Sequence, residues 1–177
     1  MRPDFDEDKD IKIMGQYNNN DKEDTVQAEH EYHLQHGNIE KARQFGAIMA
    51  DEVMAWEGDQ DNIDLLLNEQ FLYVFAATVA FDCFTPSRIT AVTALSAFYD
   101  RIKQSSPEFY TTISSSPAFS FYYLCLRNRS DLGKCVGQTF AMLCGCGEDK
   151  NLIERGKRLY SDFLVSAQGK SSQLKFA

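Results

Sequence analysis

The sequence lacks the short motifs that carry common enzyme chemistries. It has no glycine-rich phosphate loop, no H-E-x-x-H, no G-x-S-x-G and no kinase signature. Its three histidines, His30, His33 and His36, all lie in the N-terminal segment, so a triad with a nucleophile elsewhere would require that segment to fold back. These absences favour a protein without catalysis, and no cofactor is predicted.

Proline is scarce, and no segment alternates apolar and polar residues for long enough to predict a strand. Three of the four prolines, Pro86, Pro107 and Pro117, directly follow serine or threonine, and none interrupts a periodic apolar run. Proline suits the first position of a helix because its missing N–H would have no partner there. We therefore predict an all-α protein in which helices begin at these three prolines.

The chain also lacks the basic excess that nucleic-acid-binding proteins use. Its net charge is −8. Residues 1–37 hold ten acids and four bases, whereas the other 140 residues hold sixteen acids and fourteen bases. We expect no nucleic-acid partner. We interpret residues 1–37 as an acidic flexible arm, residues 38–168 as one helical domain and residues 169–177 as a frayed tail.

Long apolar runs are few, and the longest covers residues 68–84 after a helical lead-in from residue 63. As a helix this stretch is apolar on nearly every side, so it must be buried in protein or bilayer. A spanning helix needs about 20 apolar residues. This run is shorter, has Glu69 and Asp82 near its ends and lacks a flanking basic cluster. We predict a single-domain bundle of about six or seven helices around this buried central helix, without membrane insertion.

Capping residues place the other helices. Asn38 is a suitable N-cap for a helix over residues 39–56, and Ser130-Asp131 is one for a helix over residues 132–144. Glu148-Asp149 begins the last helix. On that helix we expect Arg155 to face away from the apolar side. The aromatic segment 118–126 is apolar on most faces, so we expect it to lie deep against the central helix.

Glycine recurs at a helical spacing in the segment 132–144. Gly133 and Gly137 fall four residues apart, and each costs about 1 kcal/mol relative to alanine inside a helix. Such a face indicates a close approach, either by another helix or by a flat ligand. We favour packing against the central helix, and the alternative is a pocket for a small molecule or cofactor between this face and the aromatic helices.

The cysteines are five in number, and no secretory signal precedes them, so we expect free thiols in a cytoplasmic protein. Cys83 and Cys125 lie in very apolar segments and are predicted core residues. Cys144 and Cys146 flank a glycine at a helix junction, where a thiolate is favoured, but their spacing does not fit zinc or thioredoxin motifs. Candidate ligand-binding residues are therefore Gly133, Gly137, Cys144 and Cys146.

Three carboxylates, Asp64, Glu69 and Asp82, lie in apolar surroundings. We expect each to point outward at a helix end, and one facing a cavity would be a general-base candidate. The His30, His33 and His36 spacing allows two histidines on one helix face, but no further ligands accompany them, so a solvated helix is favoured over a metal site.

Two functions remain open. The first is a helical interaction or regulatory domain without catalysis, which binds itself as a homo-oligomer or binds another protein. The second is a protein that binds a small molecule or cofactor near Gly133 and Gly137, with enzymatic activity left open.

Overall fold

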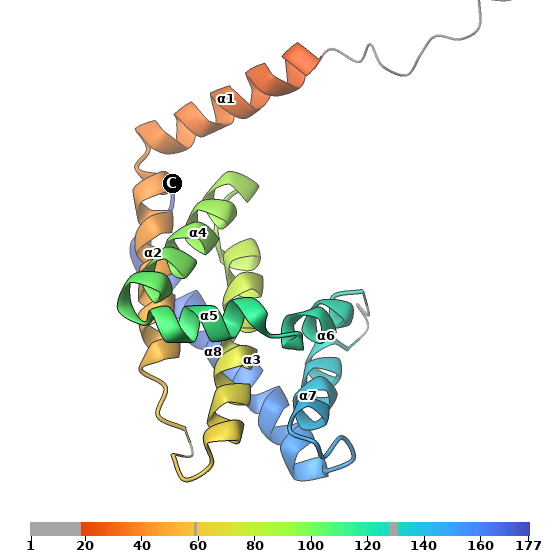
Figure 1. The fold of residues 1–177 in the computed structure, drawn as a ribbon. Coiled ribbons are helices and arrows are strands. Elements are labelled where there is room, and N and C mark those ends of the chain that lie inside the picture. The colour runs from red at the N-terminus through yellow and green to blue at the C-terminus, as the bar shows by residue number, and fades with distance from the viewer. Residues whose placement is uncertain (1–18, 59, 128–130) are drawn as a thin grey trace, which may run out of the picture.

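The computed structural model describes residues 19–58, 60–127 and 131–177. Within these ranges the chain forms eight helices and no strand, packed into one helical domain (Figure 1). In chain order the helices are α1 (Asn19–Gln35), α2 (Asn38–Met54), α3 (Ile63–Phe84), α4 (Arg88–Ser105), α5 (Pro107–Ser115), α6 (Ala118–Cys125), α7 (Leu132–Leu143) and α8 (Lys150–Leu174). The all-α prediction is confirmed. The additional helix is α1, which forms within the expected arm and projects from the end of α2, and residues 1–18 of that arm lie outside the described ranges.

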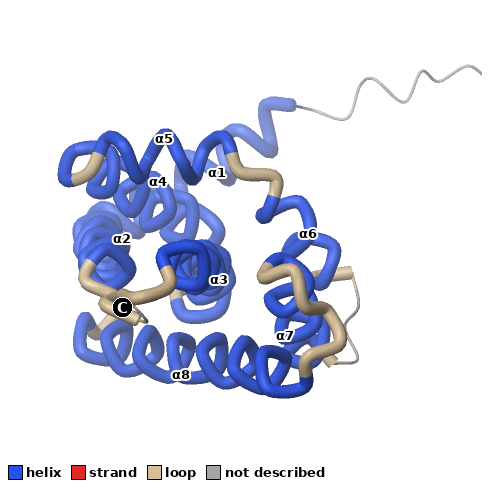
Figure 2. The backbone as a smooth tube through the Cα atoms, turned by 60° about the horizontal axis from the view of Figure 1, so that its bottom comes forward, coloured by secondary structure: helices blue, strands red, loops and turns tan. Residues whose placement is uncertain are grey.

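Helix α3 is the axis of the domain. It contacts α2, α4, α6, α7 and α8, and Figure 2 shows it near the centre with the other helices of the bundle around it. In the described residues α3 is the one helix long and apolar enough to cross a membrane, and half of its apolar window is buried by the protein itself. A helix in the core of a domain passes the same test of length and composition.

Aromatic side chains of α3 join it to the helices around it. The ring of Phe75 stacks on Tyr122 of α6, with centroids 5.1 Å apart. The ring of Phe81 meets Phe45 of α2 edge-on at 5.2 Å and Phe98 of α4 at 5.7 Å. Because all five rings are almost fully buried, this contact network forms the centre of the core.

Two of the three helices predicted to begin at prolines start later: α6 begins at Ala118, with Pro117 as its N-cap, and α4 also begins after its proline. Pro107 opens α5 as expected, but α4 begins two residues after Pro86, with Ser87 as its N-cap. Ser87 and Thr90 exchange side-chain and backbone hydrogen bonds in a capping box, which satisfies two N–H groups at once. The Thr85 hydroxyl instead donates to the Phe81 carbonyl at 2.7 Å, at the end of α3.

Asn38 has another role than the expected N-cap. It is the first residue of α2, it is fully buried, and Gly37 precedes it with a φ of 70°. Its side-chain amide donates to Ala177 O and accepts from Ala177 N–H, both at 2.9 Å. The same amide group also contacts His33 Nδ1 at 2.9 Å, which connects α1 to the start of α2 and to Ala177 at the same end of the bundle.

Residues 169–177 were expected to fray, whereas α8 continues to Leu174. Ser171 is buried, and its hydroxyl donates to the Phe84 carbonyl at 2.6 Å. Together with the Asn38 contacts, this bond docks a polar segment whose composition alone suggests a free tail.

Candidate functional site

The glycine face of α7 packs against α8. A Cβ atom on Gly137 would collide with the Ile153 carbonyl and would lie 3.3 Å from Lys157 Cβ. The same atom on Gly133 would meet Lys157 Cγ at an ordinary 3.8 Å. Close packing was therefore the better interpretation, but the partner is α8 and not the central helix. Gly137 has no space beside it for a ligand.

Cys144, Gly145 and Cys146 end α7. Gly145 has a φ of 79°, its N–H donates to Met142 O at 2.9 Å, and the Cys146 N–H donates to Ala141 O at 3.0 Å. This is the pattern of a Schellman motif, in which glycine takes the left-handed position. Burial, reinforced by the Glu69 carboxylate, raises the pKa of Cys144 to about 11. Cys144 is therefore protonated at neutral pH and a weak nucleophile.

Both cysteines line a surface cleft of about 570 Å³ between the start of α3 and the turn from α7 to α8. Gly133 and Gly137 do not line this cleft, so the structure separates the four candidate ligand-binding residues into two places. The cleft is bounded by a mixture of polar and apolar groups: Asn62, Asp64, Leu65, Leu67, Asn68, Leu143, Cys144, Gly145, Cys146 and Leu152.

Glu69 corrects one sequence prediction. Its side chain is fully buried rather than turned outward, and it is held from two sides. Trp56 Nε1 donates to one carboxylate oxygen at 2.8 Å, and Arg155 Nε donates to the other at 2.6 Å. Arg155, expected to face away, therefore faces the core through its guanidinium. A buried carboxylate whose two oxygens both accept such bonds is held as a structural group. Asp64 and Asp82 are exposed, as expected.

The three histidines face different surroundings. His33 is buried beside Asn38, His36 Nδ1 lies 2.8 Å from the Tyr32 carbonyl, and His30 lines a surface hollow with Ile89. Throughout the described ranges, no three His, Cys, Asp or Glu side chains are grouped so that they could hold a metal ion.

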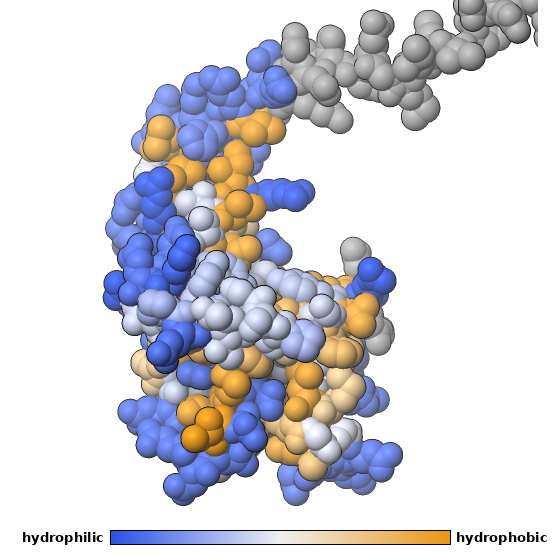
Figure 3. Space-filling view, in the orientation of Figure 1, coloured by the Kyte–Doolittle hydropathy of each residue, from blue (hydrophilic) through white to orange (hydrophobic). Residues whose placement is uncertain are grey.

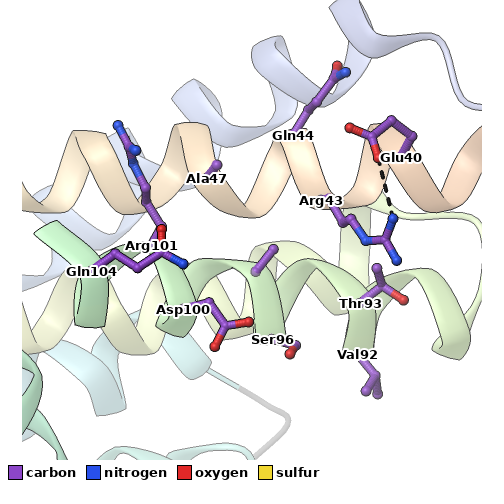
Figure 4. A pocket seen from close by; sticks show the side chains of 11 residues that line it. Glu40, Arg43, Gln44, Ala47, Val92, Thr93, Ser96, Asp100, Arg101 and Gln104 are labelled. Carbon is purple, nitrogen blue, oxygen red and sulfur yellow. Dashed lines mark hydrogen bonds and ion pairs between the residues drawn. The ribbon is translucent and has the colours of Figure 1, made fainter.

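A second surface cleft, of about 620 Å³, runs between α2 and α4 (Figure 4). Charged side chains of both signs border it, and Arg43 pairs with Glu40 across one turn of α2 at 3.4 Å. Beneath it, Gly46 lets the two helices touch, since a Cβ there would collide with the Ala94 carbonyl. Gly46 is not among the glycines that the sequence pattern predicted to lie in a close contact. The cleft is a groove between closely packed helices. Its lining mixes acidic, basic, neutral polar and apolar side chains, so it does not favour one kind of ligand.

Helix α6 exposes apolar side chains, contrary to the expectation of deep burial. Only Ala118, Tyr122 and Cys125 are buried in it. Four apolar residues remain open to solvent: Phe121 at 42%, Tyr123 at 43%, Leu124 at 54% and Leu126 at 40% exposure. We call these four residues the α6 face. Figure 3 shows hydrophobic residues at the surface over this helix.

A cavity of about 360 Å³ adjoins the α6 face, because Tyr123 belongs to both. Tyr99, Tyr110 and Phe119 also line it. Burial, with smaller effects from Tyr123 and Tyr110, raises the pKa of Tyr99 to about 12, so this hydroxyl stays neutral at physiological pH. The cavity is thus lined by aromatic rings, and the Tyr99 hydroxyl among them is neutral.

One feature of the sequence marks the region that contains the α6 face. Residues 109–126 contain no charged side chain, and the apolar character of residues 118–126 within this run was interpreted as burial. The run is instead divided between the core and the surface because α6 lies at the edge of the domain, where α3 and α7 cover only one side of it (Figure 2).

Two cysteine predictions have different outcomes. Cys125 is buried, as predicted, whereas Cys83 is exposed. The sulfur of Cys125 lies 2.7 Å from that of Cys135 on α7, a pair that the sequence analysis did not identify.

Comparisons of the chain with protein-family models, with curated proteins and with solved structures find no significant match. Helical bundles serve many functions, so a functional argument must come from the surfaces and groups described above.

Proposed function

We propose that this protein is a non-catalytic helical interaction domain that self-associates through the α6 face. The supporting observation is the exposure of four large apolar side chains within six residues. Contiguous exposed apolar surface is typical of protein interaction sites, and aromatic residues are enriched at their centres. The adjoining tyrosine-lined cavity offers a pocket for an apolar side chain of the second subunit.

The distribution of charge favours a second copy of the chain as the partner. A protein with a net charge of −8 repels its own copies over most approaches. Residues 109–126 are uncharged, so the four side chains of the α6 face bring no charge of their own to a contact between two copies about a twofold axis. Burying this face would also remove its apolar side chains from water, which contributes about 25 cal/mol per Å².

Two of the groups that were candidates for chemistry, Glu69 and Cys144, are held in the structure as unreactive groups. The Glu69 carboxylate is paired with Arg155 and Trp56. Burial holds the Cys144 thiol in its protonated form. These contacts support an interaction domain over an enzyme, and a cytoplasmic location remains part of the proposal.

Sedimentation velocity over a range of concentrations tests the proposal. We expect the wild-type chain to form a dimer and Leu124→Lys to weaken association at least roughly tenfold, since a charge would be buried at the interface. Val165→Lys is the matched control, because Val165 is 66% exposed on α8 and lies outside the α6 face. A wild-type chain that stays monomeric at high concentration, or equal effects of both variants, would refute the proposal.

The second candidate is a small-molecule site in the cleft beside Cys144 and Cys146, supported by its volume of about 570 Å³. Native mass spectrometry of freshly purified protein separates the two functions, because a retained ligand adds mass to each subunit whereas self-association multiplies the subunit mass.

A further inference from the structure

Cys125 and Cys135 bring two sulfur atoms together between α6 and α7. The separation of 2.7 Å is about 0.7 Å longer than a covalent S–S bond of roughly 2.05 Å. The two residues are ten positions apart in the chain and lie on helices that pack against each other. Their side chains therefore need only a small shift to bond.

The two positions differ in access to solvent. Cys125 is 1% exposed, whereas Cys135 is only partly buried, so a small solute reaches Cys135 first. Thr139 Oγ1 lies 3.3 Å from Cys125 Sγ, close enough to donate a hydrogen bond to the sulfur when it loses its proton. The pair thus has an outer thiol, an inner thiol and a hydroxyl beside the inner one.

We propose that Cys125 and Cys135 form a dithiol oxidation site, which a hydroperoxide converts into a disulfide between α6 and α7. The Cys135 thiolate attacks one peroxide oxygen, the O–O bond breaks, and Cys135 becomes a sulfenic acid. The departing hydroxide or alkoxide takes up the proton that the thiol had released and leaves as water or an alcohol. Cys125 Sγ then attacks Cys135 Sγ, so that the S–S bond forms, the S–O bond breaks, and the departing hydroxide takes the Cys125 proton as water. Two thiols are oxidised and one peroxide is reduced.

Burial, with a smaller effect from Cys135, raises the pKa of Cys125 to about 11, so this thiol is almost entirely protonated at neutral pH and reacts slowly with oxidants. Cys125 reacts after Cys135 has been oxidised next to it. The order of the two steps, oxidation of Cys135 and then attack by Cys125, follows from the greater exposure of Cys135. Such pairs are transient and reversible in a reducing compartment. The inference depends on the packing of α6 against α7 and is independent of self-association.

Peptide mapping of the full chain after treatment with hydrogen peroxide tests the proposal. We expect a peptide cross-linked through Cys125 and Cys135, a loss of two hydrogen atoms from the intact mass, and full reversal by dithiothreitol. The disulfide would close a short loop between adjacent helices, so the melting temperature of the oxidised protein should rise by on the order of 5 °C.

Two variants serve as controls. Cys135→Ser should lose both the cross-link and the thermal shift, whereas Cys146→Ser, at an exposed cysteine, should keep both. Failure of the wild-type chain to form this cross-link, its appearance between Cys144 and Cys146 instead, or terminal oxidation of Cys135 to a sulfinic acid would each overturn the proposal. A monomeric wild-type protein that still forms the cross-link would refute self-association and leave this site intact.

Discussion

Glu69 places a fully buried carboxylate on the helix that the other helices cover. Its two hydrogen bonds come from residues that precede and follow α3 in the chain, Trp56 and Arg155. The guanidinium of Arg155 remains about one third exposed, so the ion pair joins the core to the surface of α8. Removing one partner of a buried ion pair is expensive because the other charge stays buried without compensation.

We predict that Arg155→Met destabilises the folded state by about 3 kcal/mol at neutral pH. Glu69→Gln should have a smaller effect, because the glutamine amide oxygen can still accept the Trp56 hydrogen bond. The double variant Glu69→Gln/Arg155→Met should lose less than the sum of the single variants, since no unpaired charge remains. Urea unfolding at neutral pH measures all three free energies.

Arg101→Met is the control for this cycle. Arg101 Nε donates to Asp51 Oδ1 at 2.8 Å, but both side chains are about half exposed. Exposed ion pairs contribute little to stability because water screens them. If Arg155→Met changes the free energy of unfolding no more than Arg101→Met does, the buried ion pair does not stabilise the fold as argued.

The partnership of Glu69 and Arg155 shows what sequence patterns could not provide. Arg155 lies 86 residues after Glu69 and sits on a helix whose apolar stripe was assigned from local spacing alone. Local spacing places a side chain on a helix but does not identify its distant partner. The pairing of Cys125 with Cys135, and the docking of Ala177 on Asn38, depend on tertiary contacts in the same way.

At the scale of the helices, local signals were informative. Asp131 and Asp149 cap α7 and α8 as expected, because a carboxylate that accepts N–H bonds at a helix start is a local interaction. Burial was less predictable, since the apolar composition of α6 is equally compatible with the core and with an exposed docking surface. The glycine spacing in α7 predicted a close approach but not which helix approaches.

We predict opposite effects for two alanine substitutions on α7. Gly137→Ala should destabilise the fold by about 1–3 kcal/mol, because its Cβ collides with the main chain of α8 at Ile153. Gly133→Ala should be neutral or stabilising by up to about 1 kcal/mol, because its Cβ has room and alanine favours the helix. Gly137→Leu should be more damaging still.

Thermal unfolding followed by circular dichroism compares the two substitutions in one assay. Both variants gain the same helix propensity, so the difference between them reports the packing of α7 against α8. An unchanged melting temperature for Gly137→Ala would mean that this face is open, and it would restore the ligand pocket proposed for Gly133 and Gly137.

Across the whole molecule, several buried tyrosine and cysteine side chains are weak acids, which are neutral while they keep their proton. Burial raises the pKa of Tyr160 to about 12, and that of Tyr99 to the same value. It raises the pKa of the Cys144 thiol to about 11 and moves that of Tyr122 upward as well. In the unfolded chain these groups titrate near their ordinary values of 10.0 for tyrosine and 9.0 for cysteine.

These shifts predict that the protein loses stability in base. Each group contributes stability that is fully present below its unfolded pKa, because neither state is then ionised. As the pH rises above about 9, the unfolded chain releases protons that the folded core retains, so unfolding becomes more favourable until the folded pKa is reached. Melting temperatures measured from pH ~8 to pH ~11 should therefore fall steeply, and the phenolate absorbance of the buried tyrosines should appear together with unfolding. Tyr160→Phe should flatten this fall, because it removes one of the buried phenols and leaves its ring in the core. A melting temperature that stays constant to pH ~11 would show that the aromatic core is open to water, and the packing of these rings around α3 would then have to be reconsidered.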